Sequence, residues 1–298
     1  MSGASGSRAR GAIAFAVTTL VWGSTWLAIK HQIGSEPPAW SVTWRFALAA
    51  AGMFALALAR RERLKLERSA WPLAATIGFF QFFANFQMVY QAERYLPSGV
   101  VAVIFALLVV PNAVLGRIML DRAVSRRFIA GSVIAGAGIA LLMLHEYRDA
   151  AGGGSVLVGL TFSTGAILSA SFANVLQASD GARRQPVVVL LAWAMLVGTF
   201  ADGLWAWISV GPPQFGWSLP YAGGLAYLAL VGSVLTFPLY AVLLREWGPG
   251  KAAYNGVLIP VVAMALSTLF EGYAWTMLAA AGAMLAIAGL AVALSGRD

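Results

Sequence analysis

The chain has 298 residues, of which 60% are hydrophobic and 11% are charged. A soluble protein of this length would carry about twice that charged fraction. Apolar runs long enough to cross a bilayer also recur along the whole chain, so the composition indicates a polytopic membrane protein. The net charge of +8 falls in short clusters between these runs, which is typical of membrane topology and argues against a nucleic-acid partner. The absence of cysteine excludes disulfides and thiolate metal sites, and no cofactor is expected.

Ten apolar runs are predicted to be membrane-spanning helices, because a backbone in hydrocarbon has to satisfy its hydrogen bonds within the segment. The first run follows MSGASGSRAR. It is predicted to be retained rather than cleaved as a signal peptide, since it is long enough to span and nine similar runs come after it. In chain order the predicted spans are Gly11–Ile29, Pro38–Ala59, Trp71–Ala92, Gly99–Gly116, Phe128–Leu144, Ser155–Ser179, Pro186–Ser209, Leu219–Leu244, Ala252–Phe270 and Tyr273–Ser295.

The positions of Lys and Arg predict which side of the membrane each loop faces. If the N-terminus is cytoplasmic, sixteen of these residues fall in inside segments. Three fall outside, namely Lys30, Arg94 and Arg148, and Arg45 lies within a span. This asymmetry predicts a multi-pass protein of the bacterial cytoplasmic (inner) membrane with both termini in the cytoplasm.

An internal repeat organises the chain. Pro97–Asp121 reads PSGVVAVIFALLVVPNAVLGRIMLD, and Pro249–Glu271 reads PGKAAYNGVLIPVVAMALSTLFE. Each copy opens on a proline and closes on an acid. Each also carries a second proline in mid-run, Pro111 or Pro260, which removes a backbone hydrogen bond and permits a bend. We expect these two prolines to serve gating.

The repeat divides the chain into two five-helix halves, residues 1–150 and 151–298, joined by the flexible Gly152–Gly154 run. Because five is an odd number, the second half has to enter the membrane inverted relative to the first. Inverted repeats with a site between them are the architecture of many secondary transporters. The predicted fold is therefore an all-α membrane protein with ten transmembrane helices, arranged as two inverted five-helix repeats around a central cavity.

The first helix places Thr18, Trp22, Thr25 and Trp26 on one face at helical spacing. Hydroxyls and indoles in mid-span suit a cavity that holds an amphipathic solute. Alternatively, the hydroxyls bond their own backbone and the indoles pack against neighbouring helices.

The tandem five-helix halves, the Trp22-Gly23-Ser24 sequence and the proline-kinked helices that end in an acid resemble the drug/metabolite transporter superfamily, EamA type. Within that family the chain is most similar to the YddG-type exporters of amino acids. The resemblance implies an exporter rather than an enzyme. There is one departure, because the family's kinked helix usually ends in Gly-Glu, whereas here the residues are Leu120-Asp121 and Phe270-Glu271.

Polar residues on other helices complete the predicted cavity. Amides in a bilayer are costly unless they face protein or water, so they are expected to point inward, either as interhelical glue or as solute contacts. The predicted substrate-binding residues are Trp22, Thr25, Trp26, Gln81, Asn85, Asn174, Thr236, Tyr254 and Asn255.

Two ionisable residues, Arg45 and Asp202, lie inside predicted spans, and an intramembrane charge is a functional hypothesis by default. Their similar depth on corresponding helices favours a charge pair, or side chains that reach the outer mouth. A role in substrate binding or gating is the other reading.

Helices five and ten carry small residues four apart, at Gly131/Ala135, Gly136/Ala140 and Gly282/Ala286. Such spacing lets helices approach closely. It is compatible with a dimer face, but packing within each half is the commoner use, and a monomer is the working expectation.

An aromatic and amide-lined cavity with almost no charge suits small zwitterionic metabolites, and phosphorylated solutes would call for more Lys or Arg. The sequence therefore predicts export of amino acids by alternating access. The alternatives are a multidrug or organic-cation exporter, for which Asp202 is the candidate acid, and a channel or receptor without turnover.

Overall fold

The structure is a computed structural model, and it describes residues 2–34, 36–149, 154–213, 218–240, 243 and 254–295. These residues form helices and no strands. The start of the second repeat copy at 249–253 and the Gly152–Gly153 part of the predicted linker lie outside the described residues, as do Arg245 and Arg297 of the charge count.

The helices follow the predicted spans, with shorter elements between and within them. In chain order they are α1 (Ser2–Gln32), α2 (Pro38–Ala59), η1 (Arg68–Ala70), α3 (Trp71–Ile77), η2 (Gly78–Ala84), α4 (Asn85–Ala92), α5 (Ser98–Phe105), η3 (Ala106–Leu108), α6 (Val109–Leu120), α7 (Arg126–Asp149), α8 (Gly154–Gln177), α9 (Asp180–Arg183), α10 (Val187–Ser209), α11 (Leu219–Ala226), η4 (Tyr227–Leu235), α13 (Asn255–Phe270) and α14 (Met277–Ser295).

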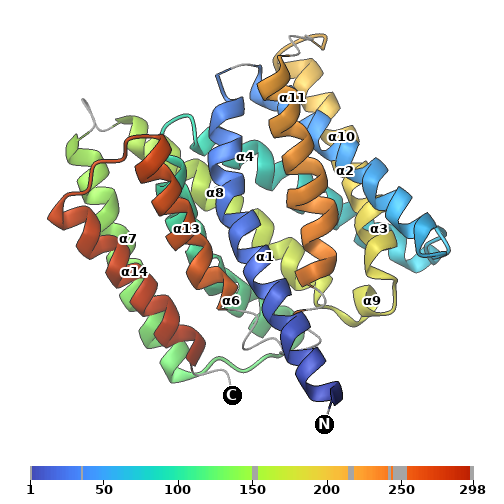
Figure 1. Ribbon diagram of the computed structural model, residues 1–298, viewed down its shortest axis with the longest axis horizontal. Coiled ribbons are helices and arrows are strands. Elements are labelled where there is room, and N and C mark those ends of the chain that lie inside the picture. Colours follow the sequence, from blue (N-terminus) through green and yellow to red (C-terminus); the bar gives the residue numbers. More distant parts are fainter. Residues whose placement is uncertain are drawn as a thin grey trace.

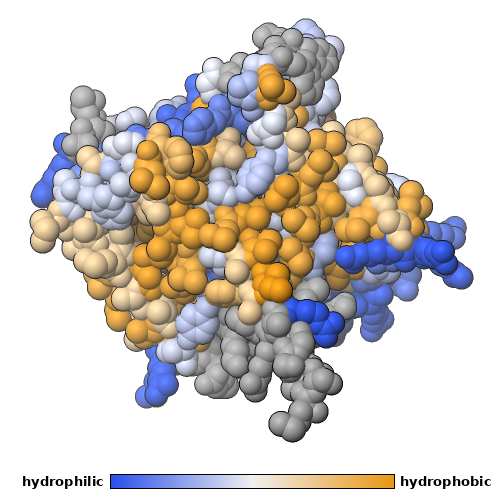
Figure 2. Space-filling view, viewed as in Figure 1, coloured by the Kyte–Doolittle hydropathy of each residue, from blue (hydrophilic) through white to orange (hydrophobic). Residues whose placement is uncertain are grey.

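Eight helices in the described part of the chain are long and apolar enough to cross a membrane. Figure 2 shows apolar residues across the middle of one face of the molecule, with hydrophilic residues toward its edges. Two of the ten predicted spans fall outside this set. The run Trp71–Ala92 is helical throughout but is built from α3, η2 and α4, and α13 is an apolar helix of 16 residues.

Several helix contacts between residues 1–150 and residues 151–298 occur twice, once for a pair of helices and once for the counterparts of that pair. We call these exchangeable pairs. Helix α1 packs on α13 while α8 packs on α6, and η2 packs on α10 while η4 packs on α2. Three further large contacts join counterparts directly, α2 with α10, α5 with α13 and α7 with α14, and α4 packs extensively on α8. In Figure 1, α2 and α10 lie on one side of the molecule and α7 and α14 on the other.

Both ends of the described chain lie at the same end of the molecule, where α1 begins and α14 finishes. We call this the terminal end and the other the distal end. The start of α5 and the finish of α13 lie together at the distal end, where Ser98 and Glu271 are in contact.

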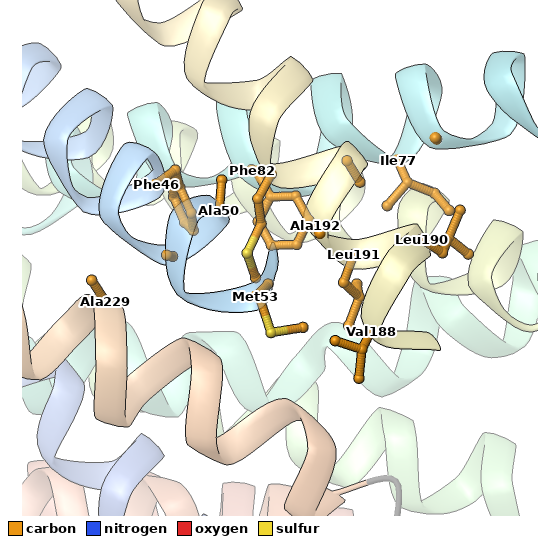
Figure 3. Packing of buried hydrophobic residues seen from close by; sticks show 14 of the residues in the cluster. Phe46, Ala50, Met53, Ile77, Phe82, Val188, Leu190, Leu191, Ala192 and Ala229 are labelled. Atoms are coloured by element: carbon orange, nitrogen blue, oxygen red, sulfur yellow. The ribbon is translucent and has the colours of Figure 1, made fainter. Parts of the chain in front are cut away.

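The largest core cluster joins α2, η2 and α10. Phe46 and Phe82 lie with ring centroids 5.2 Å apart, and Met53 and Ala192 are fully buried beside them (Figure 3). This core therefore joins helices of residues 1–150 to helices of residues 151–298 by apolar packing.

Glycines bring α7 and α14 into backbone contact. A Cβ added to Gly138 would lie 2.3 Å from the backbone nitrogen of Ala286, and one added to Gly289 would lie 2.3 Å from that of Ala135. The small residues therefore join the two halves to each other, and the expectation that they pack within each half is wrong. The reason is that α7 and α14 pack mainly against each other, on one side of the molecule.

Gly138→Ala is expected to destabilise the protein by about 1–3 kcal/mol, because the added methyl meets backbone that has no rotamer in which to move aside. Gly136→Ala, two residues earlier in α7, is the matched control, since its added Cβ has nothing within 4 Å. The control should be neutral or slightly stabilising. Thermal unfolding in detergent measures both, and equal melting temperatures for the two variants would contradict the packing account.

Candidate functional site

Two π-helical segments occupy corresponding places in the two halves. Segment η2 follows α3, an α-helical run of 7 residues, and η4 follows α11, a run of 8 residues. Both runs have a proline in their first turn, Pro72 or Pro220. The π-helix is rare and often marks a functional site, so this pair singles out the third helix of each half.

Side chains satisfy the backbone carbonyls that the π segments leave irregular. The Ser233 hydroxyl donates to the Leu228 carbonyl at 3.1 Å, five residues back, and Thr236 donates to Val231 with the same spacing. A change from i−4 to i−5 bonding leaves some backbone groups without their regular partner, and a membrane interior offers no water to replace it.

Two further hydrogen bonds to carbonyls of the π segments cross between the halves. The Trp22 indole Nε1 on α1 donates to the Gly232 carbonyl in η4 at 3.2 Å. The Ser169 hydroxyl on α8 donates to the Phe80 carbonyl in η2 at 2.9 Å. The first helix of each half thus bonds the π segment of the other.

A chain of aromatic rings runs through the same region. Ring centroids lie 5.7 Å apart for Trp22 and Phe237, 6.2 Å for Phe237 and Phe82, and 4.8 Å for Phe46 and Phe86. With the Phe46–Phe82 contact, these five residues form what we call the central aromatic cluster. It connects α1, the helical residues directly after η4, η2, α2 and α4, so it lies where both halves meet.

The first-helix residues take different roles in the structure. Trp22 and Trp26 are half-buried, and the Trp26 ring lies 5.1 Å from that of Phe105. Thr25 is buried and donates to the Trp22 carbonyl at 2.8 Å, one turn back along its own helix. The structure thus places the two indoles at the helix junctions and occupies the Thr25 hydroxyl with backbone.

The amides of the third and sixth predicted helices meet across the interface. The Gln177 amide donates to the Gln81 side-chain oxygen at 3.4 Å, and Asn85 donates to the Gln81 carbonyl at 3.3 Å. The Asn85 Oδ1 atom is buried and has no hydrogen-bond partner among the described residues. Asn174 is half-buried on α8.

The predicted residues of the eighth and ninth helices are distributed differently. Thr236 is fully buried with its hydroxyl bonded to the backbone, and Tyr254 is 38% exposed just before α13. Asn255 is buried and bonded to α1, since it donates to the Thr18 hydroxyl and accepts from the Thr19 hydroxyl, both at 2.5 Å. Asn255 therefore holds α13 against α1.

The two repeat prolines lie in unequal surroundings. The 3₁₀ turn η3 directly precedes α6, in which Pro111 is the third residue, so the helical ladder is irregular in the turn before this proline. Pro260 lies inside α13, which is α-helical from Asn255 to Phe270. Each proline removes one backbone donor.

Arg45 and Asp202 are buried, at 3% and 0% exposure, so neither side chain reaches the outer mouth as the sequence suggested. They also have separate partners instead of forming a pair. The Gln87 amide donates to Asp202 Oδ1 at 2.7 Å, and the Arg45 guanidinium carbon lies 4.4 Å from the Phe86 ring centroid. Arg45 Nε and Nη1 have no hydrogen-bond partner among the described residues.

A buried acid that the sequence analysis did not select lies at the distal end. Glu93 follows α4 directly, is fully buried, and has no hydrogen-bond partner for either carboxylate oxygen among the described residues. Burial raises the pKa of this carboxyl well above its ordinary value, although the Lys30 ammonium acts in the opposite direction. The Lys30 ammonium itself donates to the backbone carbonyls of Glu93 and Leu96.

A family model described as the EamA-like transporter family matches residues 9–144 and again 157–295. This chain belongs to the EamA-like transporter family. The match covers most of the chain, and the protein is a membrane transporter rather than an enzyme.

Among curated proteins, the chain is 24% identical to a "Probable amino-acid metabolite efflux pump" of Salmonella typhimurium, over 97% of this chain and 96% of that protein. It is 24% identical to "Protein PagO" of the same organism, over 88% and 85%. It is 28% identical to the "Uncharacterized inner membrane transporter YedA" of Escherichia coli K12, over 85% and 80%.

A solved crystal structure shares this EamA-like fold. The two superpose with a TM-score of 0.67 at 18% identity, covering 95% of this chain and 96% of the other. At this identity the likeness bears on the fold alone.

Sequence reasoning did not identify several parts of the site in this EamA-like chain. The π segments have no residue that marks them, although Ser233 and Thr236 are of the type that bonds its own backbone. Glu93 could have been selected from the sequence, because an acid directly after an apolar run is a candidate for burial. The phenylalanines of the central aromatic cluster gave no such signal, since nine of the ten predicted spans contain phenylalanine.

Stability is expected to depend on pH through Glu93. Its folded-state pKa lies above its unfolded value, so folding takes up a proton, and the stabilisation falls as pH rises from about 4.3 through the folded pKa. Glu93→Gln cannot ionise and should melt with less dependence on pH, and above the parent at alkaline pH. The exposed Glu67→Gln is the control. Identical pH profiles of melting temperature for parent and Glu93→Gln would contradict a neutral buried acid.

Proposed function

We propose that this chain is a secondary transporter that exports small zwitterionic metabolites, foremost amino acids, across the bacterial cytoplasmic membrane by alternating access. Ten spans form two inverted five-helix halves, with the terminal end in the cytoplasm. The excess of Lys and Arg in the terminal-end loops supports this orientation.

The observation that carries the proposal is the pair of π segments, each hydrogen-bonded to the first helix of the other half. A carrier has to exchange the arrangements of its halves about a fixed site. The exchangeable packing of α1 on α13 and α8 on α6 supplies two related arrangements. Each π segment has a non-standard ladder that can shift between i−4 and i−5 bonding.

The lining supports a zwitterionic substrate. The central aromatic cluster offers ring faces to an apolar side chain, and it leads to Arg45, whose ring contacts are with Phe46 and Phe86. A buried guanidinium with unpartnered donors favours a carboxylate, which it binds through two parallel hydrogen bonds. The unpartnered Oδ1 of Asn85 is an acceptor for an ammonium group.

The alternative substrate class is organic cations, and the buried Asp202 is the observation that favours it. Its Oδ2 atom has no hydrogen-bond partner among the described residues, although Gln87 bonds the other oxygen. Loss of a pH-dependent cation efflux in Asp202→Asn, with no amino-acid flux in the parent, would select this class.

Purified protein in liposomes is expected to show saturable counterflow of a labelled neutral or aromatic amino acid. Arg45→Lys and Arg45→Gln should raise KM by about 10- to 100-fold, because a charged hydrogen-bonding partner of the carboxylate is weakened or lost. Arg94→Gln is the matched control, since Arg94 bonds Gln91 at an exposed position. Unsaturable flux, or no flux of any amino acid or cation, would contradict the proposal.

Pro111→Ala and Pro260→Ala are expected to lower kcat several-fold while KM changes less, because each restores a backbone donor and stiffens a helix that has to bend. The same counterflow assay, run over a range of substrate concentrations, separates the two constants. Unchanged kcat in both variants would remove the prolines from the gating mechanism.

A further inference from the structure

The carboxylate of Glu271, at the finish of α13, bonds the start of α5 at the distal end. The Ser98 hydroxyl donates to Glu271 Oε2 at 2.6 Å, and the Ser98 backbone N–H lies 3.3 and 3.2 Å from the two carboxylate oxygens. The Ser267 hydroxyl, one turn back on α13, donates to the same oxygen. Glu271 thus connects a helix of the second half to one of the first.

Glu271 supplies a cap that α5 lacks in its own sequence. The N-cap residue of α5 is Pro97, which has no side-chain acceptor for the first free N–H groups. A carboxylate at this position also interacts favourably with the positive end of the helix dipole. Separating α13 from α5 would therefore leave the first turn of α5 uncapped.

The backbone at the end of α13 fixes the direction of this side chain. Tyr273 N–H bonds the Ser267 carbonyl, six residues back, and Gly272, directly before Tyr273, has a left-handed φ of 68°. A glycine is needed there because a positive φ is unfavourable for other residues. Glu271 is consequently held at the last helical turn, facing Ser98.

The packing beneath this contact is tight. A Cβ added to Gly99 would lie 2.7 Å from the Met264 sulfur and 2.9 Å from Ser267 Cβ. Every residue from Ser98 to Ile104 of α5 is buried. In contrast, only Ala113 and Gly116 of α6 are buried, and α13 packs on α5 and η3 but not extensively on α6. The pair α5–α13 is therefore closed at the distal end.

The acid that ends the first repeat copy has no such contact. Asp121 is exposed and itself adopts the left-handed conformation, with φ of 52°. Its side chain makes no hydrogen bond to any residue that the structure describes. The two repeat acids thus differ in their contacts. Glu271 bonds another helix at the distal end, whereas Asp121 at the terminal end is exposed.

We propose that Glu271 is a latch that holds the outer side of the transporter closed through Ser98, and that this latch opens when α5 and α13 separate. The inference rests on the proposed alternating access. The inference extends that mechanism by naming the residue that sets the balance between the closed and open states of the outer side. Asp121 plays no part in closing the outer side.

The test uses the absence of native cysteine. Met264→Cys places one thiol in the closed α5–α13 interface, where Met264 is 3% exposed. A membrane-impermeant maleimide applied from the outside should label this thiol at least about tenfold faster in the Glu271→Ala background than in the parent, since charge-assisted hydrogen bonds are the strong ones. Ser98→Ala and the near-isosteric Glu271→Gln should give smaller increases, and they keep the test informative if Glu271→Ala does not fold.

Asp121→Ala in the same Met264→Cys background is the matched control and should leave the labelling rate unchanged. Equal labelling in the parent and all three latch variants would overturn the proposal, as would an equal increase in Asp121→Ala. The readout needs no substrate, so faster labelling without amino-acid flux would uphold the latch and remove the proposed substrate. A disulfide between the two thiols of the double variant Ser98→Cys/Glu271→Cys should hold the outer side closed. It should therefore slow maleimide labelling of a separate outer-facing thiol, and a reductant should reverse this effect.

Discussion

A helix in a bilayer has to satisfy its backbone hydrogen bonds inside the protein, and the arrangement of this molecule follows from where that rule is strained. The spacing of the backbone hydrogen bonds changes in η2 and η4. Each change leaves backbone carbonyls to which side chains donate hydrogen bonds. Ser233 and Thr236 do so within their own helix, whereas Trp22 and Ser169 do so from the opposite half. The irregular helices are therefore also the ones that connect the halves. A transporter needs such points, because a regular α-helix offers only one hydrogen-bonded arrangement and a segment between α and π offers two.

The two ends of the molecule differ in how firmly the halves are joined. At the distal end Glu271 caps α5, so a polar contact between the halves is added to tight apolar packing, and Lys30 bonds the carbonyls of Glu93 and Leu96 within the first half. Toward the terminal end, most residues of α6 are half-buried or exposed, and Asp121 is exposed. The glycine contact of α7 with α14 runs along one side of the molecule and joins the halves by backbone packing, which suits a fixed frame rather than a moving gate.

Sequence patterns predicted the membrane class and the family well, because composition and run length are averages over many residues. They predicted individual contacts less well, and the helices show why. Gln81 and Asn85 were both predicted to bind substrate, but η2 is π-helical at Gln81, and the Asn85 amide bonds the Gln81 backbone. Arg45 and Asp202 were expected to form a pair, yet Asp202 bonds Gln87 and the Arg45 guanidinium lies over the Phe86 ring. Glu271 looked like a simple repeat of Asp121, but Gly272 rather than the acid takes the left-handed position in the second copy. Such differences depend on one residue and its neighbours in space.

In the proposed alternating access, the two ends of the molecule open in turn, and α5–α6 moves relative to α13. The most direct measurement is the distance between spin labels placed on these helices, or in the turn directly before α5, at each end of the chain, which has no native cysteine. Tyr95 with Phe270 reports the distal end and Ile118 with Leu258 the terminal end, and all four positions are exposed. The account predicts two distance populations at each end, with conditions that lengthen one pair shortening the other. A single unchanging distance at both ends, with and without transported solute, would contradict it.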